Sequence, residues 1–100
     1  MSKGFWIANL NIKDQAAYDE YRKRNTAAFK KFDGKFIVRG GKYECPIGTA
    51  RQHNVVIEFP SYDQALACYR SPEYQDASQY LKRGCEVDLV IIGGYDSPQP

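Results

Sequence analysis

The sequence predicts an α+β fold of the ferredoxin-like class, a β-α-β-β-α-β sandwich whose antiparallel sheet has the spatial order 4-1-3-2. Four segments have the β-branched and aromatic residues of strands, and two longer stretches carry apolar residues at helical spacing. Right-handed crossovers in this order place both helical regions on one face of a single sheet. A chain of 100 residues suits one core. We expect one domain over residues 1–96 and a disordered tail at 97–100.

The first strand and the first helix occupy the N-terminal third of the chain. A strand is predicted from about residue 5 to 12, and Asp14 then offers a carboxylate that caps a helix. Apolar residues continue at helical spacing over 15–32, with lysines and arginines between them. The helix should end at Asp33-Gly34, where we expect the glycine to adopt the left-handed conformation.

A long hairpin follows. Its first strand is predicted over 35–39 and is closed by two glycines, and the return strand is predicted over 51–59. The segment between them is ambiguous, although Pro46, Ile47 and Gly48 resemble the tip of the hairpin.

The second helical region is predicted in two pieces, which precede the last strand. Ser61 begins a capping box, so that a short helix should run to about residue 69. Ser71-Pro72 then restarts the helix, because serine is a good N-cap and proline suits the first helical position. This second piece should stop near residue 84, and the most apolar strand occupies 86–92.

Composition excludes several classes of protein. Fourteen Lys and Arg against twelve Asp and Glu leave a formal charge of +2, far from the basic stripe of a nucleic-acid binder. The chain has no apolar run long enough for a membrane span and no signal-peptide pattern, so we expect a cytoplasmic protein with no membrane partner. Cys45, Cys68 and Cys85 show no metal-ligand spacing, and with His53 as the sole histidine we expect neither a metal nor another cofactor.

Both faces of the predicted sheet are apolar. Alternation along the strands assigns one set to the helices: Trp6, Ala8, Leu10, Phe36, Val38, Val55, Ile57, Phe59, Val87, Leu89 and Ile91. The other face still carries Phe5, Ile7, Ile37, Val56, Val90 and Ile92. Because so much apolar surface needs a cover, we expect a homodimer that packs sheet to sheet about a two-fold axis.

The same second face should carry one polar residue per strand: Asn9, Arg39, Glu58 and Asp88. A hairpin turn near residues 48–49 would place Arg39 opposite Glu58, with Asn9 beside Glu58 and Asp88 beyond it. These four residues are either a functional constellation inside a dimeric barrel or an interface network whose charges neutralise one another.

Five residues are candidates for binding a ligand between helices and sheet: Tyr18, Tyr21, Asn25, Arg39 and Tyr69. Tyrosines offer apolar surface together with a hydroxyl, and a buried amide must find a partner. The guanidinium of Arg39 suits a carboxylate. The alternatives are ordinary ones: tyrosines at the edge of the core, an amide that ties a backbone group, and an Arg39–Glu58 ion pair.

His53 and Arg39 are the candidate catalytic residues. The histidine titrates near neutral pH and so suits a general base, and the arginine suits an anionic substrate. Alternatively, His53 is a solvated residue ahead of its strand.

Several sequence blocks resemble a known family. They are Lys3–Ala8, Tyr18-x-x-Tyr21 with Asn25, Gly34–Gly41, Val55–Ser61 and Ala67–Gln75. In these blocks the chain resembles the small bacterial proteins that are grouped as domain of unknown function 1330, within the dimeric α+β barrel superfamily. The resemblance covers about residues 3–95 and implies the ferredoxin-like fold and the sheet-to-sheet dimer. Cys68 departs from the family, whose members often carry a large aromatic residue there.

The family has no agreed activity, but the wider superfamily includes cofactor-free oxygenases, small isomerases and haem-degrading enzymes. Their ligands commonly lie between helices and sheet. The resemblance therefore implies a homodimeric, cofactor-free enzyme or binder of a small polar or carboxylated organic molecule. The alternative is a non-catalytic dimeric module in which the same polar residues are structural.

Overall fold

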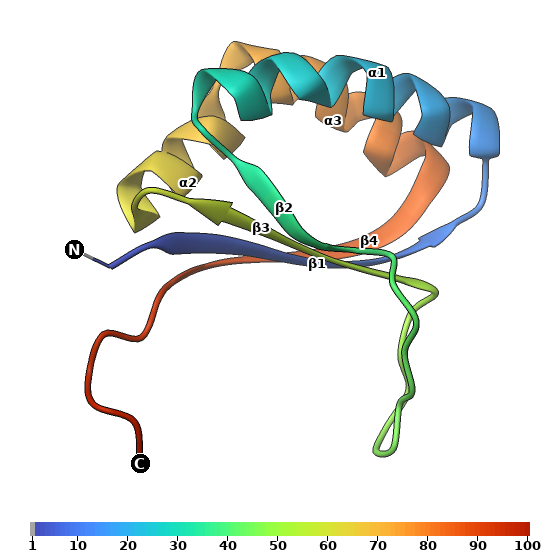
Figure 1. Cartoon of the computed structure of the whole chain (residues 1–100). Helices are drawn as coiled ribbons and strands as arrows, with labels where there is room; N and C mark the ends of the chain where they lie inside the picture. The colour runs from blue at the N-terminus through green and yellow to red at the C-terminus, as the bar shows by residue number, and fades with distance from the viewer. Residues whose placement is uncertain (1) are drawn as a thin grey trace.

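In the computed structural model, which describes residues 2–100, three helices cover one face of a four-stranded sheet (Figure 1). The elements are β1 (Gly4–Ile12), α1 (Gln15–Lys31), β2 (Lys35–Arg39), β3 (His53–Phe59), α2 (Tyr62–Arg70), α3 (Pro72–Gly84) and β4 (Cys85–Gly93). The sheet is antiparallel with the order β2-β3-β1-β4, which is the predicted order read from the other edge.

Helix α1 begins as the sequence predicts but ends differently. The Asp14 carboxylate accepts hydrogen bonds from two amides of the first turn, at 3.1 and 3.3 Å. At the other end, Asp33 rather than Gly34 takes the left-handed conformation, with φ of 58°. The Gly34 amide donates to the Phe29 carbonyl at 2.8 Å and closes the helix. Glycine is needed at position 34 for space, because a Cβ there would lie 2.9 Å from the Phe59 ring.

Serine side chains separate α2 from α3, as predicted. The Ser61 hydroxyl accepts from the Gln64 amide at 3.1 Å and caps α2. The buried Ser71 hydroxyl donates to the Cys68 carbonyl at 2.6 Å and accepts from the Tyr74 amide at 3.1 Å. One side chain therefore ends α2 and begins α3.

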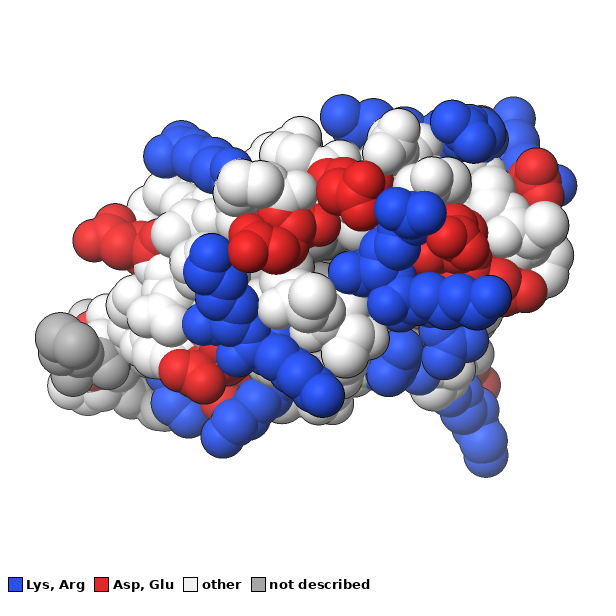
Figure 2. All heavy atoms as spheres, turned by 90° about the horizontal axis from the view of Figure 1, so that it is seen from above, with Lys and Arg blue, Asp and Glu red and all other residues white. Residues whose placement is uncertain are grey.

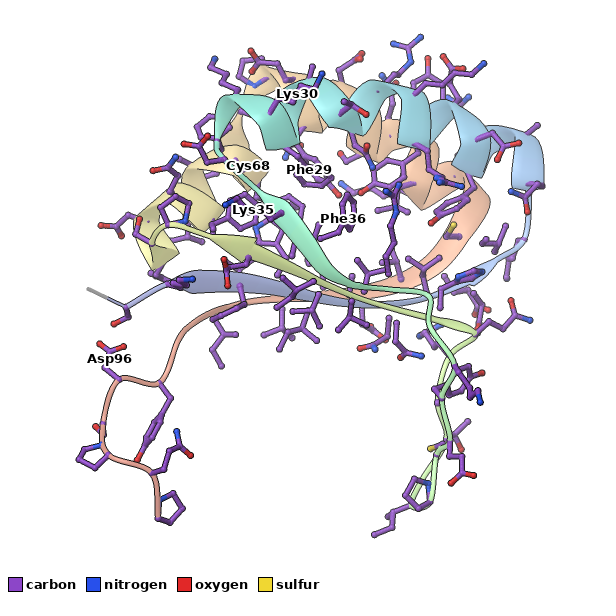
Figure 3. All side chains as sticks on the ribbon, viewed as in Figure 1. Phe29, Lys30, Lys35, Phe36, Cys68 and Asp96 are labelled. Carbon is purple, nitrogen blue, oxygen red and sulfur yellow. The ribbon has the colours of Figure 1, made fainter. Side chains whose placement is uncertain are left out.

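The core is aromatic and is centred on Trp6. Its indole is 2% exposed, donates to the Ala65 carbonyl at 2.9 Å, and meets the rings of Phe29 and Tyr74 edge to face. Phe29 of α1 also meets Phe36 of β2 edge to face, with ring centroids 5.5 Å apart (Figure 3). These rings hold α1 over β2.

A register shift in β2 changes which way its end faces. Phe36 lies opposite Ile57, but Val38 lies opposite Val56, so the strand carries an irregularity between positions 36 and 38. Arg39 then lies opposite Val55, a buried residue on the helix-covered side. The placements of Val38 under the helices and Arg39 on the open face are therefore wrong, because one additional residue reverses the alternation.

The predicted polar network on the open face is consequently different. Glu58 lies opposite Lys35, not Arg39, and forms an ion pair with Lys3 at 3.2 Å. Asn9 does lie beside Asp88, but Glu58 is at the other end of the sheet, opposite Phe5 of β1.

Around Asn9, the neighbouring groups are already paired. Its amide donates to the Asn54 side chain at 2.7 Å, and Arg51 forms an ion pair with Asp88 at 3.0 Å. In this part of the open face the polar side chains therefore pair with one another, as the interpretation of an interface network expects.

The face of the sheet opposite the helices is open and apolar. Several large side chains on it are exposed: Ile7 by 38%, Ile37 by 54%, Val38 by 43%, Val90 by 53% and Ile92 by 47%. Figure 1 shows the hairpin between β2 and β3 and the segment after β4 projecting on this same side of the sheet. The open face is thus flanked at two ends by chain from its own protomer.

The outer surface of the helical layer is polar, with acidic and basic groups interspersed (Figure 2). Arg24 of α1 contacts Glu20 at 2.9 Å and Asp76 of α3 at 3.0 Å, and Lys31 contacts Glu73 at 3.0 Å. Within residues 2–100, no helix has the length and apolar character needed to cross a membrane.

Candidate functional site

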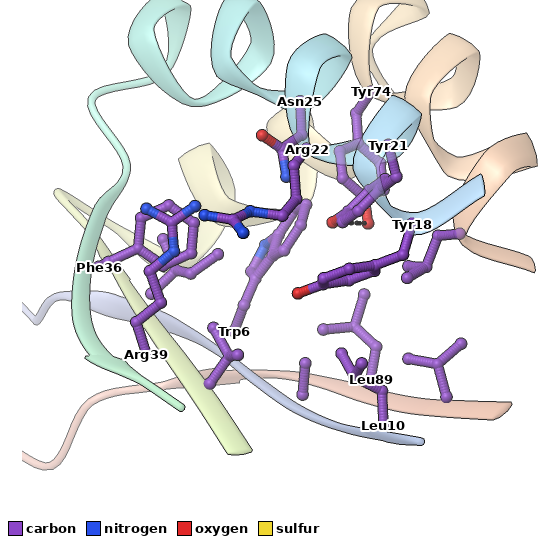
Figure 4. Close-up of a pocket in the computed structure, with 15 residues that line it drawn as sticks. Trp6, Leu10, Tyr18, Tyr21, Arg22, Asn25, Phe36, Arg39, Tyr74 and Leu89 are labelled. Atoms are coloured by element: carbon purple, nitrogen blue, oxygen red, sulfur yellow. Dashed lines mark hydrogen bonds between the residues drawn. The ribbon is translucent and has the colours of Figure 1, made fainter. Parts of the chain in front are cut away.

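A cavity of about 40 Å³ lies between α1 and the sheet (Figure 4). Its walls are mainly apolar, and its polar groups come from α1, α3 and β2. The lining residues are Trp6, Ala8, Leu10, Tyr18, Tyr21, Arg22, Asn25, Phe36, Arg39, Val55, Ile57, Tyr74, Leu81, Val87 and Leu89.

Four of the predicted ligand-binding residues meet at this cavity: Tyr18, Tyr21, Asn25 and Arg39. The first three lie on one face of α1, as helical spacing requires. Arg39 reaches the cavity because of the irregularity in β2, which the sequence did not indicate. Their presence here gives no test of the binding role, which stays a prediction.

Arg22 was not predicted. It lies four residues after Tyr18 and three before Asn25, so helical spacing alone places it on the same face. Figure 4 shows the Arg22 and Arg39 side chains extending toward each other from α1 and β2. Two cationic groups therefore stand at the entrance of an apolar cavity.

Within the described part of the chain, neither guanidinium has a carboxylate partner. The ion pairs among residues 2–100 involve Lys3, Lys13, Arg24, Lys31 and Arg51, and not Arg22 or Arg39. Arg39 instead lies over the Phe36 ring, with its Cζ atom 4.0 Å from the ring centroid. A guanidinium stacked in this way keeps its N–H edge free for a planar anion.

Buried polar groups occupy the inner end of the cavity. The Asn25 side chain belongs to a residue that is only 4% exposed, and the hydroxyls of Tyr21 and Tyr74 lie 2.9 Å apart. Burial raises the pKa of Tyr21 to about 12, although its hydrogen bonds to Tyr74 and Asn25 oppose the shift. Burial also raises the pKa of Tyr74. Both phenols are therefore neutral at physiological pH and act as hydrogen-bonding groups.

Tyr18 lies between the inner cavity and its mouth. Burial raises the pKa of its phenol, while the nearby charge of Arg22, and less strongly that of Arg39, lowers it. Its ring centroid is 6.0 Å from that of Tyr21 and 6.3 Å from that of His53. A neutral Tyr18 can donate a hydrogen bond to an anion held by the two arginines.

His53 lies at the mouth and does not line the inner cavity. It borders an outer hollow of about 190 Å³ together with Tyr18, Arg22, Arg39, Gly40 and Val55. Gly40 has a φ of 65°, and a Cβ there would lie 3.2 Å from His53 Nδ1. The glycine that follows Arg39 thus leaves room for the imidazole.

Tyr69 is separated from the other candidates. It packs against Trp6 and Tyr74, with ring centroids 6.0 and 5.5 Å apart, and borders a different hollow on the far side of Tyr74. The separation of Tyr69 from the cavity could not be predicted from the sequence, because it depends on how α2, which carries Tyr69, packs against α3, which carries Tyr74.

Two of the three thiols are buried, namely those of Cys68 and Cys85. Burial raises the pKa of Cys68 to about 12 and also raises that of Cys85, so both thiols are protonated. Cys45 is exposed on the hairpin. Within residues 2–100, no three His, Cys, Asp or Glu side chains converge in a way that could hold a metal ion.

Solved structures of the same shape show the fold of this chain. A protein of unknown function from Rhodopseudomonas palustris is 16% identical, with a TM-score of 0.75 over 96% of this chain and 85% of that one. A dimeric protein of unknown function with a ferredoxin-like fold from Bacteroides fragilis is 16% identical, with a TM-score of 0.59 over 90% and 94%. The ferredoxin-like prediction is thereby confirmed.

A third structure is that of SnoaB, a cofactor-independent oxygenase from Streptomyces nogalater. It is 13% identical, with a TM-score of 0.63 over 100% of this chain and 97% of that one. At these identities the likeness concerns the fold and not the activity.

Sequence comparison gives the family but no characterised relative. No curated protein matches the chain. The family described as "Domain of unknown function (DUF1330)" matches residues 3–95, which confirms the resemblance of the sequence blocks. The chain therefore belongs to the DUF1330 family.

Proposed function

We propose that each protomer of a homodimer binds a small carboxylated organic molecule in the cleft between α1 and the sheet, without a metal ion. The observation that carries this proposal is the pair of arginines at the entrance of an apolar cavity, Arg22 and Arg39, neither of which forms an ion pair with a carboxylate of residues 2–100. A carboxylate between them would relieve their mutual repulsion and accept hydrogen bonds from both. The apolar walls would hold the uncharged part of the molecule.

The dimer is supported by the open face of the sheet. Exposed apolar groups such as Ile7, Val90 and Ile92 lie side by side there in the antiparallel register of β1 and β4. A second copy packed sheet to sheet would cover them in both protomers at once. The structure from Bacteroides fragilis, which shares the fold, is described as dimeric.

An enzymatic role for the same cleft rests on His53 and Arg39. His53 borders the outer hollow beside Tyr18, and an imidazole is the side chain most often used as a general base. The phenols of Tyr21 and Tyr74 cannot serve as a base there, because burial keeps them protonated. We therefore propose ligand binding as the primary function and His53 as the base of any proton transfer at the mouth.

Calorimetric titration with butyrate tests the binding proposal. The wild-type protein should bind butyrate, whereas Arg39→Gln and Arg22→Gln should each weaken binding by about tenfold, because each removes one charged hydrogen-bond donor. Lys30→Gln is the matched control: it also removes one positive charge, but Lys30 lies on the outer side of α1 (Figure 3). Equal affinities for all four proteins, or equal binding of butyramide, would contradict the proposal.

A further inference from the structure

We infer that the ligand is a short-chain oxo- or hydroxy-carboxylic acid rather than a simple alkanoate or an aromatic acid. The inference rests on the proposed function and goes beyond it, because it names the chemical class. Two features of the cavity carry it. One is the buried amide of Asn25, and the other is the size of the space that the walls enclose.

Asn25 has hydrogen-bonding capacity beyond its contact with Tyr21. Its amide can donate two hydrogen bonds and accept two. One of these is used by the Tyr21 phenol, whose pKa that hydrogen bond lowers. The residue is 4% exposed and lines the cavity. A ligand that brings a carbonyl or hydroxyl oxygen to the remaining groups of the amide would therefore gain a hydrogen bond that a plain alkanoate cannot form.

The place of Asn25 distinguishes it from the arginines. Arg22 and Arg39 are exposed and border the outer hollows as well as the inner cavity. Asn25 is buried and borders the inner cavity but not the outer hollows. A ligand that uses both therefore has its carboxylate at the mouth and a second oxygen farther in. A plain fatty acid has no second oxygen for the amide, and a polyol has no negative charge to pair with the two guanidiniums.

The volume limits the carbon skeleton. The inner cavity has about 40 Å³, whereas an engineered apolar cavity that accepts benzene has about 150 Å³. A skeleton of a few carbons fits against Leu10, Val55 and Leu89, while an aromatic ring would require the walls to move apart.

The test compares acids of matched size by titration calorimetry of the wild-type protein. Butyrate, 2-oxobutyrate and 3-hydroxybutyrate differ by one oxygen, and benzoate adds a ring. At least one of the two oxygenated acids should bind about tenfold more tightly than butyrate, because it forms an additional hydrogen bond with the amide of Asn25. Benzoate should bind more weakly than butyrate.

Variants of Asn25 then assign the preference. Asn25→Leu should remove the advantage of the oxygenated acids over butyrate, whereas Arg39→Gln should weaken the binding of all the acids together. Asn25→Ser retains a donor and an acceptor and should restore part of the preference. Circular dichroism shows whether either Asn25 variant is folded, and the comparison of the acids in the wild-type protein does not depend on these variants.

The outcomes separate the two proposals. If butyrate binds and neither oxygenated acid binds better, the inference is overturned while the proposed function stands. Tighter binding of benzoate would also overturn it. If none of the four acids binds, the proposed function fails.

Discussion

Single residues in this protein are constrained by space as much as by conformation. Gly34 follows the left-handed Asp33, and its own role is to leave room for the Phe59 ring. Gly41, in contrast, has nothing within 4 Å of the position that a Cβ would occupy. The two glycines therefore form a matched pair for testing the packing of the core.

Gly34→Ala should destabilise the fold by about 1–3 kcal/mol, because the added methyl group forces the Phe59 ring to move. Gly41→Ala should change the free energy of unfolding by less than about 0.5 kcal/mol. Urea denaturation followed by circular dichroism gives both values. Similar losses in the two variants would show that space beside Phe59 is not the reason for glycine.

The buried pair Tyr21–Tyr74 makes stability depend on alkaline pH. The pKa of Tyr21 is near 10 in the unfolded chain and about 12 in the fold, so the folded state holds its proton more tightly. The stabilisation is complete below pH 10 and is lost as the pH rises toward 12. Between these values Tyr21→Phe should have a slope of stability against pH that is shallower by about 1.4 kcal/mol per unit. Urea denaturation at pH 9, 10 and 11 measures it, and parallel slopes would contradict the assignment.

At the scale of elements, the local signals that begin and end helices could be predicted from the sequence. Asp14, Ser61 and Ser71 cap the three helices as expected, because a capping side chain acts on amides within three residues. The placement of Arg39 could not be predicted, since it depends on an irregularity of pairing between β2 and β3 that only the partner strand shows. Arg22 could have been placed beside Tyr18 and Asn25 from its helical spacing alone.

Three of the ligand-binding candidates lie together at the cavity because they belong to one helix, whereas two other candidates do not line it. Tyr18, Tyr21 and Asn25 share one helix face, so their convergence at the cavity required no tertiary information. Tyr69 and His53 lie on other elements, and their distance from the cavity depends on packing that the sequence pattern does not encode.

Ser71→Ala should cost about 1–2 kcal/mol, because the hydroxyl serves two helices and is buried. Ser61→Ala, which removes the cap of α2 alone, should cost less. Urea denaturation of the two variants makes the comparison. A larger loss for Ser61→Ala would mean that the connection between α2 and α3 is held by other contacts.

Deletion of Ile37 tests the irregularity in β2. Without Ile37, Val38 would follow Phe36 directly and keep facing the open side, and Arg39 would still lie opposite Val55 on the helix-covered side, so butyrate binding should be retained. Ile37 is 54% exposed, so its loss costs little packing. A loss of butyrate binding by about tenfold in a folded deletion variant, as expected for Arg39→Gln, would show that Arg39 does not follow this pairing with Val55.

At the scale of the whole molecule, the two faces of the sheet have different roles. The helices cover one face and enclose the cavity, while the other face presents Ile7, Val90 and Ile92 to solvent in the single chain. Our proposal assigns that face to a second copy. Val90→Lys, at the middle of the open face, should shift sedimentation from dimer to monomer, because burying an unpaired ammonium in the interface is costly. Lys42→Ala, on the hairpin, is a neutral control. A monomeric wild-type protein would contradict the proposal.

The central claim, that the cleft between α1 and β2 binds a small carboxylate, is tested most directly by nuclear magnetic resonance of the ¹⁵N-labelled protein during titration with 2-oxobutyrate. The account predicts saturable shifts of the Arg22 and Arg39 Nε–H signals and of the Asn25 side-chain amide, with the Arg70 Nε–H signal unchanged. Shifts confined to the hairpin or the open face of the sheet, or no saturable shift at all, would contradict it.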